Sequence, residues 1–102
     1  MAGFNIVWTS AARKDLKSIL AYFIKRNGNT HYSRKLHTLI KEKLKLLAQN
    51  PHLGFPTDLN GVKIIHIGPY QIIYEITHQT IIIVMIWDNR QDPDKKNLME
   101  RV

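Results

Sequence analysis

The sequence predicts an α/β protein of the α+β kind: a two-layer β-α-α-β-β-β sandwich in which a helical hairpin packs on an antiparallel sheet, with a short C-terminal helix. Three observations predict this fold. The second half of the chain contains the short apolar runs VKIIHI, YQIIYEIT and TIIIVMIW, the first half contains two helical patterns, and the chain starts with the strand-like segment FNIVW. With 102 residues we expect one domain, 1–102, with one core.

The three apolar runs predict an antiparallel meander. They are rich in Ile, Val and Tyr, and turn residues separate them: Gly68-Pro69 between the first two, and His78-Gln79 between the last two. The last run is apolar on both faces. Strict alternation places Ile81, Ile83, Met85 and Trp87 on one face and Ile82, Val84 and Ile86 on the other. A strand of this kind belongs inside the sheet.

The first helix follows the strand at residues 4–8, which we expect in the same sheet as the meander. Thr9 or Ser10 is suited to cap its N-terminus, and Asn27-Gly28 is suited to end it. Its apolar positions have the spacing of one buried stripe: Ala12, Leu16, Ile19, Leu20 and Phe23.

The second helix starts at Asn29 or Thr30 and ends at Asn50-Pro51, because proline disfavours helical geometry in the preceding residue. Its predicted inner side consists of Tyr32, Leu36, Leu39, Ile40, Leu44 and Leu47. Lys43 projects between the two flanks of this arc. Its stem either lies over the core with the ammonium in water, or points into a groove.

Two segments complete the fold. Residues 52–61 (HLGFPTDLNG) are dense in turn residues and are predicted to be a loop. Near the C-terminus, Asp92 is suited to cap a short helix, with Pro93 at its first position, that runs toward Arg101.

The charge of the chain is concentrated in its N-terminal half. Residues 1–50 hold ten Lys or Arg against Asp15 and Glu42, a balance of +8, whereas residues 51–102 hold five against six acids, a balance of −1; the total is +7. Candidate partner-binding residues on the outer helical faces are Lys14, Lys17, Arg34, Lys41 and Lys45. These side chains either bind an acidic partner or are solvated surface.

Several classes of function find no support in the sequence. The chain has no cysteine, no apolar run near the roughly 20 residues that span a bilayer, no phosphate-binding glycine loop and no HExxH. Asp88, Asp92 and Asp94 suggest a metal site, but Pro93 replaces the glycine of a calcium loop, and helix capping explains the string better. We therefore expect a soluble, cytoplasmic protein with no membrane association, metal or cofactor.

Several strings resemble one family of proteins. VWTSAARKDLKSILAYF, NPHLGFP, GVKIIHIGPYQIIYEI and IIIVMIWDNRQDP are similar, in this order, to the RelE/ParE superfamily of bacterial toxins from type II toxin–antitoxin modules. The resemblance covers nearly the whole chain and implies a toxin neutralised by a cognate antitoxin. ParE-like members poison DNA gyrase, whereas RelE-like members cut mRNA on the ribosome without a metal.

The resemblance to the nucleases is partial. Arg90 and Lys63 match basic positions of RelE-like enzymes, and His66 could act as acid or base, so these three residues are the candidate catalytic set if the chain is an endoribonuclease. Gln71 replaces an arginine that the nucleases commonly carry, and no Tyr or His follows Arg90. Asp88, Asp92 and Asp94 are close enough in sequence to pair with Arg90.

The sequence therefore supports three hypotheses in order. The first is a ParE-like toxin whose target is DNA gyrase. The second is a RelE-like enzyme that acts on ribosome-bound mRNA, and the third is a basic accessory domain that binds nucleic acid.

Overall fold

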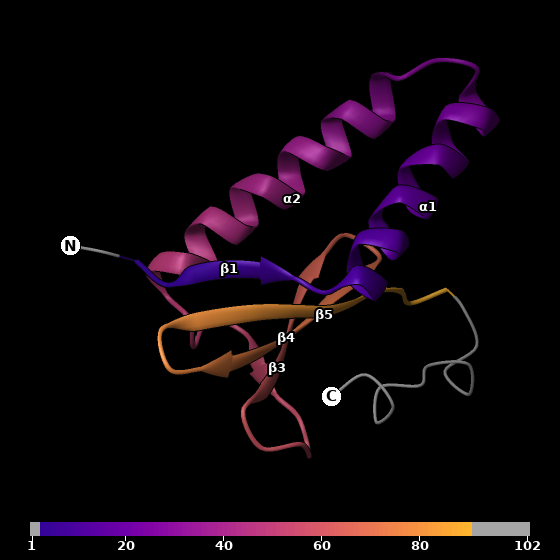
Figure 1. Ribbon diagram of the computed structural model, residues 1–102. Helices are drawn as coiled ribbons and strands as arrows, with labels where there is room; N and C mark the ends of the chain where they lie inside the picture. The colour runs from indigo at the N-terminus through magenta and orange to yellow at the C-terminus, as the bar shows by residue number, and fades with distance from the viewer. Residues whose placement is uncertain (1–2, 91–102) are drawn as a thin grey trace.

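A computed structural model describes residues 3–90, which fold into two layers (Figure 1). The elements in chain order are β1 (Asn5–Trp8), α1 (Ser10–Asn27), α2 (His31–Gln49), β2 (Phe55–Pro56), β3 (Val62–Ile67), β4 (Tyr70–Thr77) and β5 (Thr80–Asp88). One sheet has the order β1-β5-β4-β3-β2, and both helices cover the same face of it. The predicted α+β sandwich is confirmed. The helix expected from Asp92 toward Arg101 lies outside the described residues.

The ends of the helices follow from local chemistry. The Thr9 hydroxyl accepts a hydrogen bond from the Ala12 amide at 3.1 Å and caps α1. Gly28 ends α1 with a φ of 72°, a left-handed conformation that glycine adopts without a steric penalty. Before α2, the Asn29 side chain accepts from the His31 amide at 3.1 Å. Both predicted helix starts are therefore confirmed to within a residue.

The sheet is mixed and not purely antiparallel. The meander of β3, β4 and β5 is antiparallel as predicted, and β5 lies inside the sheet between β4 and β1. However, β1 pairs with β5 in parallel, with Asn5 opposite Thr80 and Trp8 opposite Ile83. The alternation of apolar residues in β1 specifies which side chains are buried and contains no information about strand direction, so the prediction of a wholly antiparallel sheet was wrong.

A β-bulge in β5 changes the predicted faces of that strand. Ile83 lies opposite Tyr74, but Met85 lies opposite Ile73, so Val84 is an extra residue. After the bulge the alternation shifts by one position. Met85 therefore joins Val84 on the face away from the helices, and Ile86 returns to the helix side. The strict alternation that placed Met85 with Ile83 was wrong, because it assumed no extra residue.

Helix α1 supplies polar partners to the bulged edge of β5. The Thr9 hydroxyl donates to the Ile83 carbonyl at 3.0 Å, and the Asp15 carboxylate accepts from the Ile86 amide at 3.1 Å. The Ile83 carbonyl also accepts from the Thr9 amide at 3.1 Å, directly after the end of β1, and no β1 residue lies opposite Ile86. The start of α1 is thus fixed to β5 by polar contacts as well as by packing.

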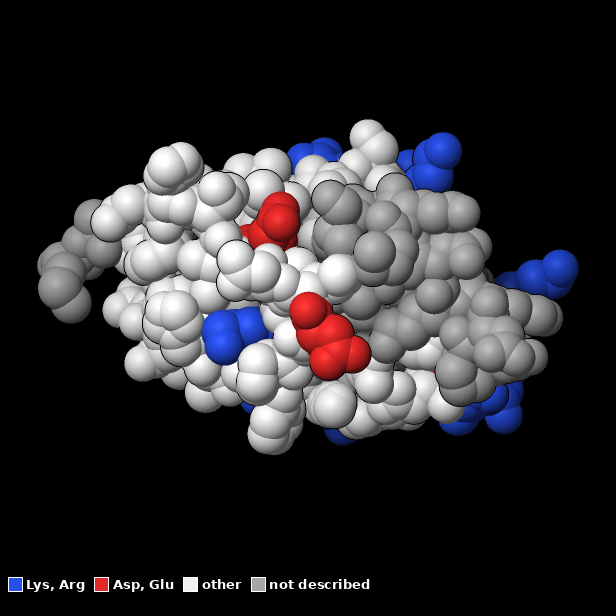
Figure 2. All heavy atoms as spheres, turned by 90° about the horizontal axis from the view of Figure 1, so that it is seen from below, with Lys and Arg blue, Asp and Glu red and all other residues white. Residues whose placement is uncertain are grey.

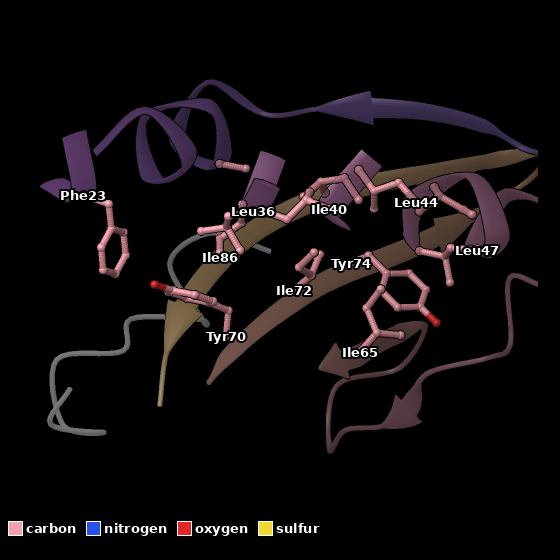
Figure 3. Close-up of a cluster of buried hydrophobic side chains, with 13 residues drawn as sticks. Phe23, Leu36, Ile40, Leu44, Leu47, Ile65, Tyr70, Ile72, Tyr74 and Ile86 are labelled. Atoms are coloured by element: carbon pink, nitrogen blue, oxygen red, sulfur yellow. The ribbon is translucent and has the colours of Figure 1, made fainter. Parts of the chain in front are cut away.

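The core lies mainly between the helices and the sheet (Figure 3). Buried side chains from α1, α2, β3, β4 and β5 converge there, including Phe23, Ile40, Leu47, Tyr70 and Tyr74. A second cluster lies on the other sheet face and consists of Val62, Ile73, Val84 and Met85, with Leu59, Ile64, Ile82 and Trp87 against it. None of the helices in the described part of the chain is long and apolar enough to cross a membrane.

Two further expectations were wrong, one for the buried side of α2 and one for the loop that follows it. Tyr32 and Leu39 were predicted on the buried side of α2, but 39% and 45% of their surfaces are exposed. The predicted loop at 52–61 contains the two-residue strand β2, which pairs with Lys63 and Ile64 of β3. Leu39 lines a surface groove with His66 and Ile67 of β3, and the Tyr32 ring, in the first turn of α2, contacts the Phe23 ring of α1 at a centroid distance of 4.4 Å.

Candidate functional site

Arg90 follows the last residues of β5 and is held by Asp88. Its Nε donates to Asp88 Oδ1 at 2.9 Å, and its Nη2 donates to Asp88 Oδ2 at 2.7 Å. The Arg90 amide also donates to Asp88 Oδ1 at 2.9 Å. These hydrogen bonds hold the pKa of Asp88 below its usual value and raise the pKa of Arg90. The predicted pairing with Asp88 is confirmed; Asp92 and Asp94 lie outside the described residues.

Tyr70 lies beside this ion pair. Asp88 is opposite Tyr70 in the β4–β5 register, and the guanidinium carbon of Arg90 is 5.9 Å from the centre of the Tyr70 ring, within the range of a cation–π contact. Burial, and to a smaller extent the electrostatic effect of the nearby Tyr32 phenol, raises the pKa of Tyr70 to about 12. A phenol with this pKa stays protonated near neutral pH and is a poor proton donor or acceptor there.

Lys63 and His66 lie on opposite faces of β3. Lys63 is opposite Tyr74, whose side chain is in the core below the helices, whereas His66 is opposite Gln71. Residues separated by an odd number of positions in a strand point to opposite faces. The His66 ring contacts the exposed Phe55 ring at a centroid distance of 6.1 Å.

The candidate catalytic set is therefore not assembled as one cluster. Among residues 3–90, no hydrogen bond, ion pair or ring contact joins any two of Arg90, Lys63 and His66. Cleavage of RNA without a metal needs a base, an acid and a cation around one phosphate. Here the cation that follows β5 is neutralised by Asp88, and the two candidates on β3 point away from each other.

All five predicted partner-binding residues are exposed: Lys14, Lys17, Arg34, Lys41 and Lys45. Within the described range, the Arg90–Asp88 contact is the one ion pair, so none of the five is neutralised by a neighbouring acid in that range. Seen from the sheet side, the described part of the surface is largely uncharged, and most of its visible Lys and Arg side chains project at the margins (Figure 2). The ten Lys and Arg of residues 1–50 all lie in α1 and α2, so positive charge among the described residues is concentrated on the helical layer, where an anionic surface would be attracted.

A groove that the sequence analysis did not locate lies between α2 and the edge of β3. It has a volume of about 310 Å³ and is lined by Leu39, Glu42, Lys43, Leu46, His66 and Ile67. Lys43, whose stem was expected either to lie over the core or to point into a groove, is one of the lining residues. The width of the apolar arc on α2 was the available signal, because Leu39 and Leu46 could not both lie over the core with Ile40 and Leu47.

In the described part of the chain, no three His, Cys, Asp or Glu side chains are close enough together to hold a metal ion. Asp88 is occupied by Arg90, and the other two residues of the suggested acidic site are beyond residue 90.

Comparisons with known proteins agree with this architecture. A family model described as the ParE toxin of the type II toxin-antitoxin system parDE matches residues 6–93. A solved structure described as the chromosomal ParDE TA system from Pseudomonas aeruginosa has 25% sequence identity and a TM-score of 0.72, covering 83% of this chain and 95% of that chain. The toxin-antitoxin complex RelBE2 from Mycobacterium tuberculosis has 21% identity and a TM-score of 0.64, covering 89% of this chain and 97% of that chain. The identity to RelBE2 is low enough that this likeness shows the fold alone. No significant match to a curated protein is found.

The helical hairpin, the five-stranded mixed sheet and these matches define a toxin of the RelE/ParE superfamily. Because the family model covers most of the chain, the chain belongs to the ParE toxin family of type II toxin–antitoxin systems.

Proposed function

We propose that this protein is a ParE-like toxin that inhibits DNA gyrase, arrests growth and is held inactive by a cognate antitoxin. The observation that carries the proposal is the match of the ParE toxin model to residues 6–93, together with the likeness to a ParDE system at 25% identity. On this proposal the pair stabilises a plasmid that encodes it, because cells that lose the antitoxin are inhibited.

The geometry at the end of β5 supports inhibition by binding over RNA cleavage. In a metal-independent nuclease, an arginine would stabilise the negative charge that grows on the scissile phosphate. Arg90 instead forms a bidentate pair with Asp88, and Tyr70, with its pKa of about 12, is a poor proton donor near neutral pH. Lys63 and His66 lie on opposite faces of β3, an arrangement that does not favour joint action on one phosphate.

The decisive experiment compares two assays on the same purified protein. We expect inhibition of DNA supercoiling by gyrase, reversed by the antitoxin encoded beside the gene for this chain, and no cleavage of mRNA in a ribosome-bound translation complex. The Arg90→Ala variant is measured in both assays, with Arg26→Ala, which removes an exposed arginine from the last turn of α1, as the matched control. Codon-positioned cleavage by the native protein that is lost in folded Arg90→Ala and kept in Arg26→Ala would establish the endonuclease instead.

The exposed helical cations are proposed to speed association with an acidic partner. Replacing Lys14, Lys17, Arg34, Lys41 and Lys45 with Gln should slow association with the antitoxin or with gyrase at low salt, and the difference should shrink as salt rises. Gln at Lys25 and Arg26, which are also exposed, provides the control. If the five-residue variant associates at the native rate at low salt, these side chains are solvated surface only.

A further inference from the structure

The two helices each direct a row of cations away from the sheet. Arg34, Lys41 and Lys45 have the seven- and four-residue spacing that places side chains on one stripe of α2. Lys14 and Lys17 share one stripe of α1 in the same way, and all five side chains are exposed. The buried hydrophobic residues of the two helices lie on other stripes and belong to the core: Ala12, Phe23, Leu36, Ile40, Leu44 and Leu47. We call the surface formed by the two rows the outward hairpin face.

Contacts near the closed end of the hairpin hold the two rows in a fixed relation. The buried Ser33 hydroxyl donates to the Leu20 carbonyl at 2.7 Å, and Lys17 and Arg34 each lie within one turn of this contact. From the closed end the helices diverge toward the sheet (Figure 1). Packed helices lie about 8–10 Å apart, a distance between the widths of the minor and major grooves of DNA, about 6 and 12 Å. Two rows at this spacing can contact the phosphates on both sides of a groove.

The two acidic residues of the helices, Asp15 and Glu42, are directed to other sides. The Asp15 carboxylate accepts from the Ile86 amide at 3.1 Å, on the side of α1 that meets β5. Glu42 lines the groove beside β3 together with Leu39 and Leu46. The outward hairpin face thus combines five positive side chains with neither of these carboxylates, and it attracts a polyanion.

Small hydroxyl side chains accompany the cations. Thr38 lies one turn after Arg34, and Ser18 lies one turn after Lys14; both are exposed. A protein partner is retained mainly by large aromatic or apolar anchors, whereas a phosphate backbone is bound by Lys, Arg and hydroxyl side chains. The composition of this face therefore favours a nucleic acid over an acidic protein.

The length of the α2 row fits one strand of a duplex. Arg34 and Lys45 are eleven residues apart, which corresponds to about 16 Å along the helix at 1.5 Å per residue. One strand of DNA presents a phosphate about every 3.4 Å along the duplex axis, so this row spans roughly five phosphates.

We propose that the outward hairpin face binds the phosphate backbone of duplex DNA without reading its sequence. The α2 row follows one strand, and Lys14 and Lys17 contact the strand across the groove. This inference deepens the proposed function and rests on it, because the duplex is the DNA that gyrase holds. The toxin then binds gyrase and its DNA together, and the DNA contact strengthens the inhibited complex.

The first test measures binding of the full chain to a fluorescein-labelled duplex of about 20 base pairs by anisotropy at several salt concentrations. For five phosphate contacts, the slope of log affinity against log salt should be about −4 to −5. Lys14→Gln combined with Lys17→Gln should weaken binding by about 10-fold at low salt and make the slope shallower by about two. Arg34→Gln combined with Lys41→Gln should do the same, and the losses should be equal for two duplexes of unrelated sequence.

The matched control is Arg26→Gln combined with Lys35→Gln, which changes the net charge by the same amount. Both side chains are exposed but lie on other stripes. Arg26 is eleven residues after Asp15, on the side of α1 that meets β5, and Lys35 is four residues before Leu39, on the groove side of α2. The control should bind within about two-fold of the native protein. Equal losses in the control and face variants would mean that DNA responds only to net charge, and the inference would be wrong.

The second test measures inhibition of DNA supercoiling by gyrase with the same variants. The two face variants should need about 10-fold more protein for half-inhibition, whereas the control should match the native protein. If the face variants lose DNA binding but inhibit as well as the native protein, the inference is wrong and the proposed function stands. Native DNA binding combined with weaker binding of the face variants to the antitoxin would assign this face to a protein partner and also overturn the inference. If the native protein binds DNA through this face but does not inhibit gyrase, the proposed function fails and the DNA-binding face stands.

Discussion

Removing the Tyr74 hydroxyl should release residues 51–54, which precede β2, from their contact with the core. Tyr74 is fully buried; its hydroxyl accepts from the Gly54 amide at 3.0 Å and donates to the Pro51 carbonyl at 2.9 Å. Tyr74→Phe keeps the ring and leaves both backbone groups without this partner. A buried backbone group that loses its hydrogen-bond partner costs about 1–3 kcal/mol. Gly54 and Pro51 are only partly buried, so water can replace part of each lost hydrogen bond. We therefore expect a total loss of about 1–3 kcal/mol in the free energy of unfolding.

Urea denaturation measures this loss as a lower midpoint at an unchanged m-value. The matched control is Tyr22→Phe, because 57% of the Tyr22 surface is exposed and a surface change of this kind stays within about 0.5 kcal/mol. In the Tyr74→Phe variant the Gly54 amide should also exchange faster, which separates a local release from a general loss of packing. A loss no larger than that of the Tyr22 control would refute the reasoning, since the hydroxyl would then contribute nothing to the fold.

Three further predictions concern the same strands. Gly54→Ala should destabilise the protein by about 1–3 kcal/mol in urea denaturation, because a Cβ there would lie 2.6 Å from the Tyr74 hydroxyl and 2.8 Å from the Ile64 carbonyl oxygen; native stability would show that the segment moves freely. Spectroscopic titration should find that Tyr70 ionises near pH 12, and ionisation near pH 10 would contradict its burial. Because the pKa of Tyr70 is raised in the folded protein, its contribution to stability should be full below pH 10 and should decline as the pH rises from 10 toward 12. Asp88 has a lowered pKa in the folded protein, so its contribution to stability is present above its unfolded pKa of 3.8 and declines as the pH falls below that value. Asp88→Asn should therefore make the loss of stability with falling pH less steep. An unchanged loss would mean that the pair with Arg90 is not formed in solution.

Most of the fold was predictable because each element carries its own local signal. Thr9 and Gly28 mark the ends of α1 through the chemistry of capping, which acts within a single turn. The apolar character of β5 on both faces correctly places it inside the sheet. By contrast, the direction of β1 relative to β5 depends on the path of the helical hairpin over the sheet. No pattern within residues 5–8 encodes that path, so the parallel pairing could not be derived from them.

The bulge in β5 shows a different limit of pattern analysis. A run of apolar residues from Ile81 to Trp87 fits any register, because every position is suited to burial on either face. One extra residue at Val84 then exchanges the faces of all the residues that follow it, without changing the composition. The side chains that bond to the backbone of Ile83 and Ile86 beside the bulge belong to Thr9 and Asp15, which are more than 70 positions away along the chain. The residues of β5 alone therefore do not predict the bulge.

The candidate site was predicted less well than the fold, and one of the errors could have been avoided from the sequence. Lys63 and His66 are three positions apart in a predicted strand, so alternation alone places them on opposite faces. The groove beside them was harder to predict, because it depends on β2 ending after two residues and on the turn at Gly54. Half-exposed leucines on α2 have the same helical spacing as buried ones. Only the position of the sheet edge distinguishes the two groups.

Asp88 determines what Arg90 can do. The carboxylate is the last residue of β5, fixed opposite Tyr70, and it reaches both Nε and Nη2 of the guanidinium. A phosphate that bound Arg90 in the same bidentate way would have to displace a carboxylate that is covalently tethered two residues away, and it would meet the negative charge of that carboxylate. The pair with Asp88 therefore competes with phosphate binding at Arg90, and this competition is an argument for the proposed ParE-like function.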